Sequence, residues 1–285
     1  MNQLQSTPQR RAINDREKKV IYDFGSNNGD DIPYYLKKGD MVIAVEANPV
    51  LCQNIENRFE KEIGEGRLFV ENCVLTTDDS ANEAYFYIHK DNHVLSQFPE
   101  PETPQDFEKI LLPSQSAIQL IEKYRNPYYI KIDIEHYDQA ILRTLFENDV
   151  RPPFISAESH DIEVFSLLVS LGRYNSFKLV DGISVSTKYN DHEIVVNEGT
   201  ETHSFPHHSA GPFGNDISGE WMTANNFYRL LAFENLGWKD IHATNLYPPN
   251  PDSAPTMEPY VKDAIQKKIR SFIPAPVKRI VKRII

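Results

Sequence analysis

The sequence has little cysteine and no long apolar run. Its only cysteines are Cys52 and Cys73, which is too few for a disulfide framework, so we expect a reducing compartment such as the cytoplasm. No N-terminal apolar stretch has the length of a signal peptide, and no apolar run approaches the roughly 18 residues of a membrane-spanning helix. We therefore expect neither a disulfide-stapled secreted protein nor an integral membrane protein.

Positive charge is also scarce outside the last segment. The net charge is −11, with 30 Lys and Arg against 41 Asp and Glu. An acidic body argues against nucleic acid as a partner. The exception is 260–285, where basic residues alternate with apolar ones at helical spacing; the basic ones are Lys262, Lys267, Lys268, Arg270, Lys278, Arg279, Lys282 and Arg283.

This tail predicts a basic amphipathic helix, a type of segment that binds anionic membrane surfaces. Contact with the inner face of the membrane is one explanation of the tail. Docking on its own domain, or on another subunit of a homo-oligomer, is the alternative. A proline-rich linker, 246–259, precedes the tail, and a polar segment, 1–18, which we expect to be flexible, opens the sequence.

The most informative feature is a short apolar strand, 20–24, followed by a loop with Gly25 and Gly29. A helix is predicted from Ile32, because Pro33 suits a first helical turn. A strand, a tight loop and a helix N-terminus form the cradle that α/β proteins use for nucleotide-like ligands.

The next apolar run, 41–45, ends in Glu46. An acid at the tip of the second strand is well placed to accept hydrogen bonds from ribose hydroxyls. The loop lacks the G-x-G-x-x-G spacing of dinucleotide sites, which disfavours a nicotinamide oxidoreductase. Asp30 and Asp31 would repel phosphates and would suit a cationic ligand, so S-adenosylmethionine fits the loop. A plain strand–turn–helix without a ligand remains the alternative.

Three blocks of the sequence resemble the signature blocks of the FkbM-like methyltransferases: DFGSNNG at 23–29, VEANP at 45–49 and KIDIE at 131–135. The resemblance covers about residues 19–180. It implies an α/β, Rossmann-like class I methyltransferase fold with a mostly parallel seven-stranded sheet and helices on both faces. It also implies an S-adenosylmethionine-dependent O-methyltransferase acting on sugars or natural products. The third block of the family usually continues with Gly, whereas this chain has His136.

On this basis we expect a methyltransferase domain over 19–245. Two inserted segments should shape the acceptor side, a long loop at 90–116 and an irregular stretch at 181–238. The residues expected to contact the donor are Asp23, Gly25, Ser26, Asn27, Gly29, Glu46, Ala47, Asn72 and Asp133. Asn72 is placed near the adenine by the resemblance alone, and a plain loop asparagine is the alternative.

Acids and histidines follow two predicted strands that should be neighbours. Asp133 and His136 end the strand 128–134, whereas Glu158 and His160 follow the strand 154–157. Ligands of open parallel sheets bind at this edge, so these side chains could converge. A hydroxyl acceptor needs a base or a divalent cation to lower its pKa.

We therefore predict His136 and His160, with Asp133, as catalytic residues. Asp133, Glu158 and His160 could instead ligate Mg²⁺ or another divalent cation, although no compact metal motif is present. For each histidine, a hydrogen-bonded structural role is the alternative. The pair His207 and His208 belongs to a loop that could touch the acceptor.

Two hypotheses follow from the sequence. The first is an enzyme that methylates a hydroxyl of a sugar, glycan or glycolipid precursor. The second is a catalytically inactive methyltransferase-like scaffold or binding protein tethered to the membrane surface. Loss of Asp23, Gly25, Gly29 or Glu46 would favour the second hypothesis, and the sequence keeps all of them.

Overall fold

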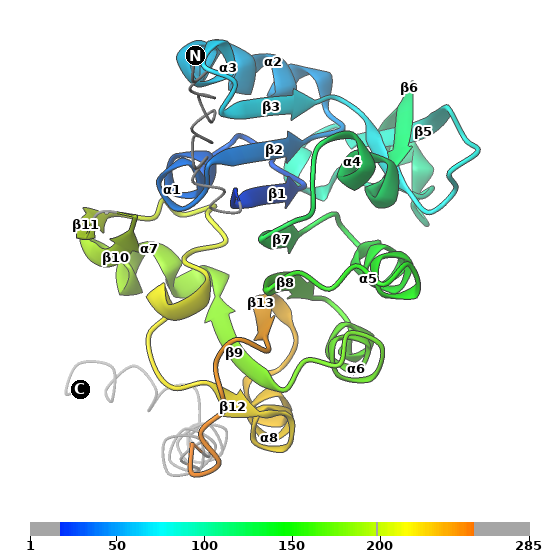
Figure 1. Cartoon of the computed structure of the whole chain (residues 1–285). Coiled ribbons are helices and arrows are strands. Elements are labelled where there is room, and N and C mark those ends of the chain that lie inside the picture. Colours follow the sequence, from blue (N-terminus) through cyan, green and yellow to red (C-terminus); the bar gives the residue numbers. More distant parts are fainter. Residues whose placement is uncertain (1–17, 198, 254–285) are drawn as a thin grey trace, which may run out of the picture.

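A computed structural model describes residues 18–197 and 199–253 (Figure 1). The predictions for the N-terminal segment, for the second half of the proline-rich linker and for the tail 260–285 lie outside the described residues. Within the described ranges, no helix is both long enough and apolar enough to cross a membrane.

A central sheet has the strand order β12-β9-β13-β8-β7-β1-β2-β3. Its strands are β1 (Val20–Phe24), β2 (Met41–Val45), β3 (Leu68–Glu71), β7 (Tyr129–Ile132), β8 (Phe154–Ser159), β9 (Ser176–Asp181), β12 (Met222–Thr223) and β13 (Gly237–Thr244). The pairs among β3, β2, β1, β7 and β8 are parallel, and β13 is antiparallel to both β8 and β9. The predicted mostly parallel, Rossmann-like sheet is therefore confirmed. It is one strand wider than predicted, because the two-residue strand β12 pairs with the outer edge of β9.

Both faces of the sheet are buried. Neighbouring residues of a strand point to opposite faces, and β1 is apolar at both: Tyr22 belongs to one buried cluster and Ile21 to the other. The helices are α1 (Ile32–Lys38), α2 (Pro49–Arg58), α3 (Glu60–Gly64), α4 (Ala117–Lys123), α5 (Asp138–Glu147), α6 (Ile162–Ser170), α7 (Val185–Lys188) and α8 (Ala224–Glu234).

Helices α4, α5, α6 and α8 bury their apolar residues with Tyr22, whereas α1 and α2 bury theirs with Ile21. Phe59, whose φ of −120° and ψ of 29° are not helical, separates α2 from α3.

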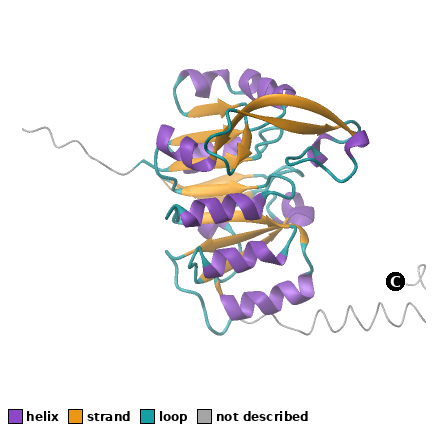
Figure 2. Ribbon diagram, turned by 90° about the vertical axis from the view of Figure 1, so that its right-hand side faces the viewer, coloured by secondary structure: helices purple, strands orange, loops and turns teal. Residues whose placement is uncertain are grey.

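A small second sheet replaces much of the loop predicted at 90–116. Strand β6 (Phe107–Ser116) pairs antiparallel with β5 (Glu83–His89) and parallel with β4 (Val74–Thr76). Figures 1 and 2 show it projecting beside the carboxyl ends of the central strands. The prediction of a loop was wrong over 107–116. Leu112, which packs with Val74 and Phe86, is the only apolar residue that the strand buries, so its sequence carries no strong apolar signal.

The irregular stretch 181–238 also contains regular structure. Strands β10 (His192–Val196) and β11 (Gly199–His203) form a hairpin, and α7 precedes it. Much of the stretch packs against α1 rather than beside the predicted site. Buried Asp216 makes this connection, because its carboxylate accepts hydrogen bonds from the Tyr34 hydroxyl at 2.8 Å and from Lys38 Nζ at 2.7 Å.

Candidate active site

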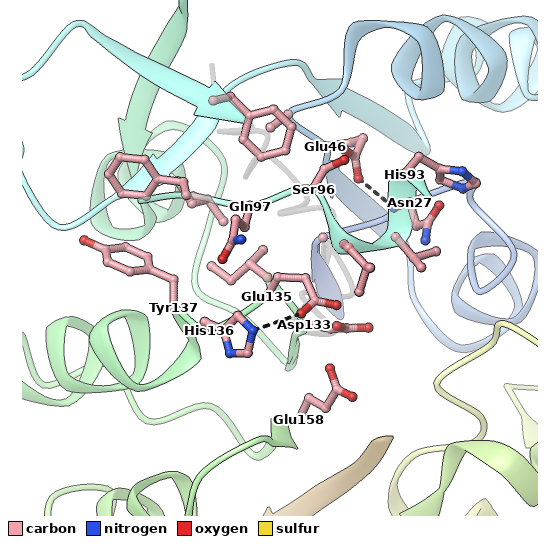
Figure 3. Close-up of a pocket in the computed structure, with 18 of the residues that line it drawn as sticks. Asn27, Glu46, His93, Ser96, Gln97, Asp133, Glu135, His136, Tyr137 and Glu158 are labelled. Atoms are coloured by element: carbon pink, nitrogen blue, oxygen red, sulfur yellow. Dashed lines mark hydrogen bonds and ion pairs between the residues drawn. The ribbon is translucent and has the colours of Figure 1, made fainter. Parts of the chain in front are cut away.

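A cavity of about 520 Å³ lies at the carboxyl ends of β1, β2, β7 and β8, beneath the segment 93–98 (Figure 3). Its volume is within the range of small-molecule sites. One wall is apolar and consists of Val45, Ala47, Leu51, Cys73, Val74 and Leu75. The opposite side carries acids and histidines that follow β7 and β8.

The loop after β1 passes so close to β7 that Gly25 has no room for a side chain. Gly25 has a φ of +82°, and a Cβ there would lie 1.9 Å from the carbonyl oxygen of Asp133. Gly25 and Asn27 line the cavity. Ser26 and Gly29 do not; Ser26 Oγ donates to the carbonyl of Asp23 at 2.8 Å, and Gly29 faces Ile55. These two residues therefore shape the turn.

Glu46 lies at the tip of β2 and lines the cavity beside this loop. Its carboxylate accepts hydrogen bonds from the backbone N–H of Asn27 at 2.8 Å and of Asn48 at 2.7 Å. Burial raises the pKa of Glu46 to about 7, although both N–H groups and Lys131 lower it. Because a carboxylate has about four acceptor sites, it can still accept bonds from a ligand in the cavity.

Asn72 supports the cavity without lining it. Its side-chain amide donates to the carbonyls of Glu46 and Ala47 at 3.0 and 2.9 Å. It therefore holds the turn after β2, and Ala47 forms part of the apolar wall instead.

Asp23 is fully buried and does not line the cavity. It lies beside Lys131, a residue that the sequence analysis did not select. Lys131 Nζ lies 3.5 Å from Asp23 Oδ1 and 3.2 Å from Asp133 Oδ2, and it donates to the carbonyl of Gly25 at 2.8 Å. A charged residue inside the apolar run of β7 was the available sequence signal. This lysine joins the glycine loop to the end of β7.

The two acids at the start of α1, Asp30 and Asp31, do not line the cavity, so they are not placed to contact a ligand within it. Asp30 pairs with Arg58 at 3.3 Å. Asp31 is buried, and its carboxylate accepts hydrogen bonds from Ser209 Oγ and from Ala210 N at 3.0 Å. Burial raises the pKa of Asp31 to about 7. These acids stabilise contacts within the fold.

The side chains after β7 and β8 meet at one side of the cavity (Figure 3). His160 Nε2 lies 2.8 Å from Glu158 Oε2 and 3.6 Å from Glu135 Oε2. The rings of His136 and His160 are 5.0 Å apart between centroids. The structure thus brings together the predicted Asp133, His136, Glu158 and His160, and it adds Glu135, which the sequence analysis did not single out.

The acids of this group have different environments. Burial raises the pKa of Glu135 to about 7, and burial together with the charge of Asp133 raises that of Glu158 to about 10. Burial is also the largest influence on the pKa of Asp133 and would raise it, but the Lys131 ammonium and a hydrogen bond with Glu158 together outweigh burial and lower that pKa. Asp133 is therefore the carboxylate that Lys131 keeps ionised.

His136 occupies a left-handed backbone conformation, with a φ of 64°. Glycine adopts this conformation without cost, which explains why glycine suits this position. The strain places an imidazole at the cavity. We expect His136→Gly to raise the free energy of unfolding by about 1 kcal/mol while removing a candidate functional group. Urea unfolding would test this, and a loss of stability in the variant would contradict it.

Two further segments contribute to the cavity wall. Residues of the segment 93–98 cover the cavity, and the Phe98 ring packs edge-on against Tyr137 with centroids 4.9 Å apart. Of the histidine pair in the loop after β11, His208 lines the cavity together with Trp238, whereas His207 does not line it and packs against the rings of His208 and Trp238.

Comparison with known proteins agrees with the three sequence blocks. The family model described as the methyltransferase FkbM domain matches residues 23–178. A search of curated proteins gave no match.

Several solved structures are similar to this chain. A methyltransferase FkbM from Methylobacillus flagellatus KT is 16% identical, with a TM-score of 0.39, over 57% of this chain and 40% of that protein. An O-methyltransferase from Bacillus cereus in complex with SAH is 10% identical, with a TM-score of 0.36, over 80% of this chain and 74% of that protein. The C-terminal domain of a precorrin-6Y C5,15-methyltransferase from Rhodobacter capsulatus is 13% identical, with a TM-score of 0.34, over 66% of this chain and 76% of that domain. The chain thus spans less than half of the length of the Methylobacillus protein.

Proposed function

The chain belongs to the FkbM methyltransferase family, and on that premise we propose that it transfers a methyl group from S-adenosylmethionine to a hydroxyl of a sugar, glycan or glycolipid precursor. One observation carries the proposal. The Gly25 loop and Glu46 lie on one side of a single cavity, and an acid–histidine group lies on the other. A donor and an acceptor could therefore meet within it. We assign the activity to the domain 19–245.

The residues on the loop side fit the donor. Gly25 and Asn27 both line the cavity, and the buried Asn27 Oδ1 has no hydrogen-bond partner among the described residues. Glu46 would accept hydrogen bonds from ribose hydroxyls, and the apolar wall with Ala47 suits an adenine ring. The ionised Asp133 would attract the cationic end of the donor. S-adenosylmethionine would supply an electrophilic methyl group bound to a sulfonium.

His136 is the base that we assign to the acceptor hydroxyl. Its imidazole lines the cavity, and 64% of its side chain is exposed there, so an incoming hydroxyl can reach it. In the reaction the hydroxyl proton passes to the imidazole. The oxygen forms its bond to the methyl carbon as the carbon–sulfur bond breaks, so the sulfonium charge is lost and the imidazole carries the proton. His160 and Asp133 would position His136 and the donor.

The scaffold hypothesis has less support, because Gly25, Asn27 and Glu46 all retain positions at the cavity. Turnover is what distinguishes the two hypotheses. The direct test is transfer of a labelled methyl group from S-adenosylmethionine to a carbohydrate or glycolipid extract. Label in that fraction supports the enzyme, whereas binding of the donor without any transfer favours the scaffold.

We expect Glu46→Gln to weaken binding of S-adenosylhomocysteine about 10- to 100-fold, because hydrogen bonds to a charged group contribute roughly 1.5–3 kcal/mol. Calorimetry would measure the affinity. Glu56→Gln is the matched control, because Glu56 is exposed on α2 and does not line the cavity. Equal affinities for Glu46→Gln and the control would contradict the ribose assignment, and no binding by the wild type would contradict the function.

The wild type and Glu46→Gln can also be compared at different pH values. The folded pKa of Glu46, about 7, is above its ordinary value of 4.5, so its contribution to stability is present below 4.5 and is lost as pH rises through 7. Ionisation should favour the ribose hydroxyls as donors, so wild-type affinity should rise between about pH 6 and pH 8. Lys131, Asp23 and Cys52 also face Glu46, and Glu46→Gln keeps all of them. A rise that persists in Glu46→Gln would assign it to one of these neighbours instead.

A further inference from the structure

We propose that Glu135, Glu158 and His160 form a binding site for a divalent cation on the acceptor side of the cavity. One ligand atom from each of these residues lies within 4.8 Å of the other two. All three residues line the cavity, so an ion held there would be accessible to an acceptor. The role in methyl transfer rests on the proposed function, whereas the binding of the ion does not.

The geometry is close to that of a coordination sphere. Ligand atoms about 2.0–2.3 Å from one ion lie roughly 3–4 Å from each other. His160 Nε2 is 2.8 Å from Glu158 Oε2 and 3.6 Å from Glu135 Oε2. Glu158 belongs to β8, His160 directly follows β8, and Glu135 lies in the short loop after β7, so the sheet holds the three residues near each other. Small side-chain rotations would suffice to admit an ion.

The charges of the site are not balanced by the protein. In residues 18–197 and 199–253, no Lys or Arg lies within ion-pair distance of Glu135 or Glu158. The Glu158 side chain is only 7% exposed. Keeping both side chains ionised in such a place is costly unless a cation joins them.

His160 provides an independent indication of a ligand. Its Nε2 atom is buried and makes no hydrogen bond within the described part of the chain, although Glu158 Oε2 is nearby. Two electron-pair donors therefore point into the same small volume. A metal ion between them would satisfy both.

The structure changes the ligand set that the sequence predicted. Asp133 was expected beside Glu158 and His160, but its Oδ2 lies 3.2 Å from Lys131 Nζ, which already neutralises it. Glu135, two residues further along the chain, replaces it. The third ligand is thus a residue without a cationic partner of its own.

The mixed ligands favour a small first-row dication such as Mn²⁺. Carboxylates suit Mg²⁺ and Mn²⁺, imidazole suits the later first-row metals, and Ca²⁺ would need more oxygen ligands than these residues supply. Three protein ligands leave coordination positions open to an acceptor hydroxyl. A cation bound there would lower the pKa of that hydroxyl, and His136 would accept its proton.

Electron paramagnetic resonance with Mn²⁺ would test the site in the full chain, because bound Mn²⁺ loses the signal of the free ion. We expect about one equivalent to bind to the wild type, and Glu135→Gln or His160→Asn to weaken the affinity at least tenfold. Glu122→Gln, an exposed acid on α4, is the control and should bind like the wild type. Wild-type protein that binds no Mn²⁺, or variants that bind it equally well, would overturn the proposal.

Binding of S-adenosylhomocysteine, measured on the same proteins, separates this proposal from the proposed function. Variants that bind it normally but have lost Mn²⁺ are folded and support the metal site. Glu135→Gln is the milder substitution, because 21% of the Glu135 side chain is exposed, and it keeps the test usable if His160→Asn fails to fold. A wild type that binds S-adenosylhomocysteine but takes up no Mn²⁺ would refute the metal site alone. A wild type that takes up Mn²⁺ but does not bind S-adenosylhomocysteine would refute the proposed function alone.

Discussion

Gly25→Ala should lower the affinity for S-adenosylhomocysteine more than 100-fold and the free energy of unfolding by about 2–4 kcal/mol. The added Cβ would lie 1.9 Å from the carbonyl oxygen of Asp133 and 2.8 Å from its carbonyl carbon. Neither backbone can move away easily. Gly25 N donates to Val45 O at 3.0 Å, and Asp133 N donates to Phe24 O at 3.0 Å. Relieving the overlap would therefore break contacts between β1 and a neighbouring strand.

Gly66→Ala is the matched control for this substitution. Gly66 also has a positive φ, +68°, but no atom lies within 4 Å of the position where its Cβ would be. The control should therefore show only the conformational cost, about 1 kcal/mol, with unchanged affinity. Calorimetry and urea unfolding would measure both effects. Gly25→Ala protein that binds S-adenosylhomocysteine like Gly66→Ala would show that the loop does not cradle the donor.

The parts of the fold that the sequence predicted are those specified by local patterns. The apolar runs of β1 and β2 predicted both strands, and Pro33 marked the first turn of α1. Strand β6 was missed because its partner β5 ends at His89, well before β6 begins at Phe107. Its sequence pattern is also weak, because Glu108 and Lys109 of β6 are charged. The hairpin of β10 and β11 is local, but it was missed because only Ile194 of its two strands is buried, so no apolar alternation marks them. Pairing between separated segments depends on tertiary contacts, which a periodic pattern does not record.

The candidate site was likewise predicted where local sequence order decides it and missed where tertiary contacts do. The order of residues after β7 and β8 predicted which elements would carry polar side chains to the cavity. It could not predict which of Asp133 and Glu135 would be neutralised within the protein, because that depends on Lys131, which reaches across from the interior of β7. Likewise, Asp31 turned out to bind Ser209, a residue far away in the chain.

Lys131→Met should lower the free energy of unfolding by about 3–5 kcal/mol, the usual effect of removing one partner of a buried ion pair. Only 3% of Lys131 is exposed, and its ammonium lies between Asp23, Asp133 and the carbonyl of Gly25. Methionine has a similar volume, so the packing should survive. Asp23 and Asp133 would then be left without a cation, so burial would raise the pKa of Asp133, which is now lowered, and would raise that of Asp23 further.

The pH dependence of the stability loss would show whether it comes from the buried carboxylates. An acid whose folded pKa is raised contributes stability below its unfolded pKa and loses it as pH rises through the folded value. The deficit of Lys131→Met should therefore be larger at about pH 7 than at about pH 5, and adding Asp23→Asn should recover part of it. Lys178→Met is the control, because Lys178 is also buried but has no carboxylate within ion-pair distance in the described ranges.

The pKa of Lys178 is lowered to about 8, by burial, so Lys178 changes its charge only above the tested interval. Its substitution should therefore give a deficit that stays constant between the two pH values, whatever the size of that deficit. Urea unfolding of both variants at both pH values measures the difference. A pH-independent deficit in Lys131→Met, no greater than that of Lys178→Met, would mean that the buried carboxylates do not depend on this lysine. The link between the glycine loop and the end of β7 would then have to come from the backbone hydrogen bonds alone.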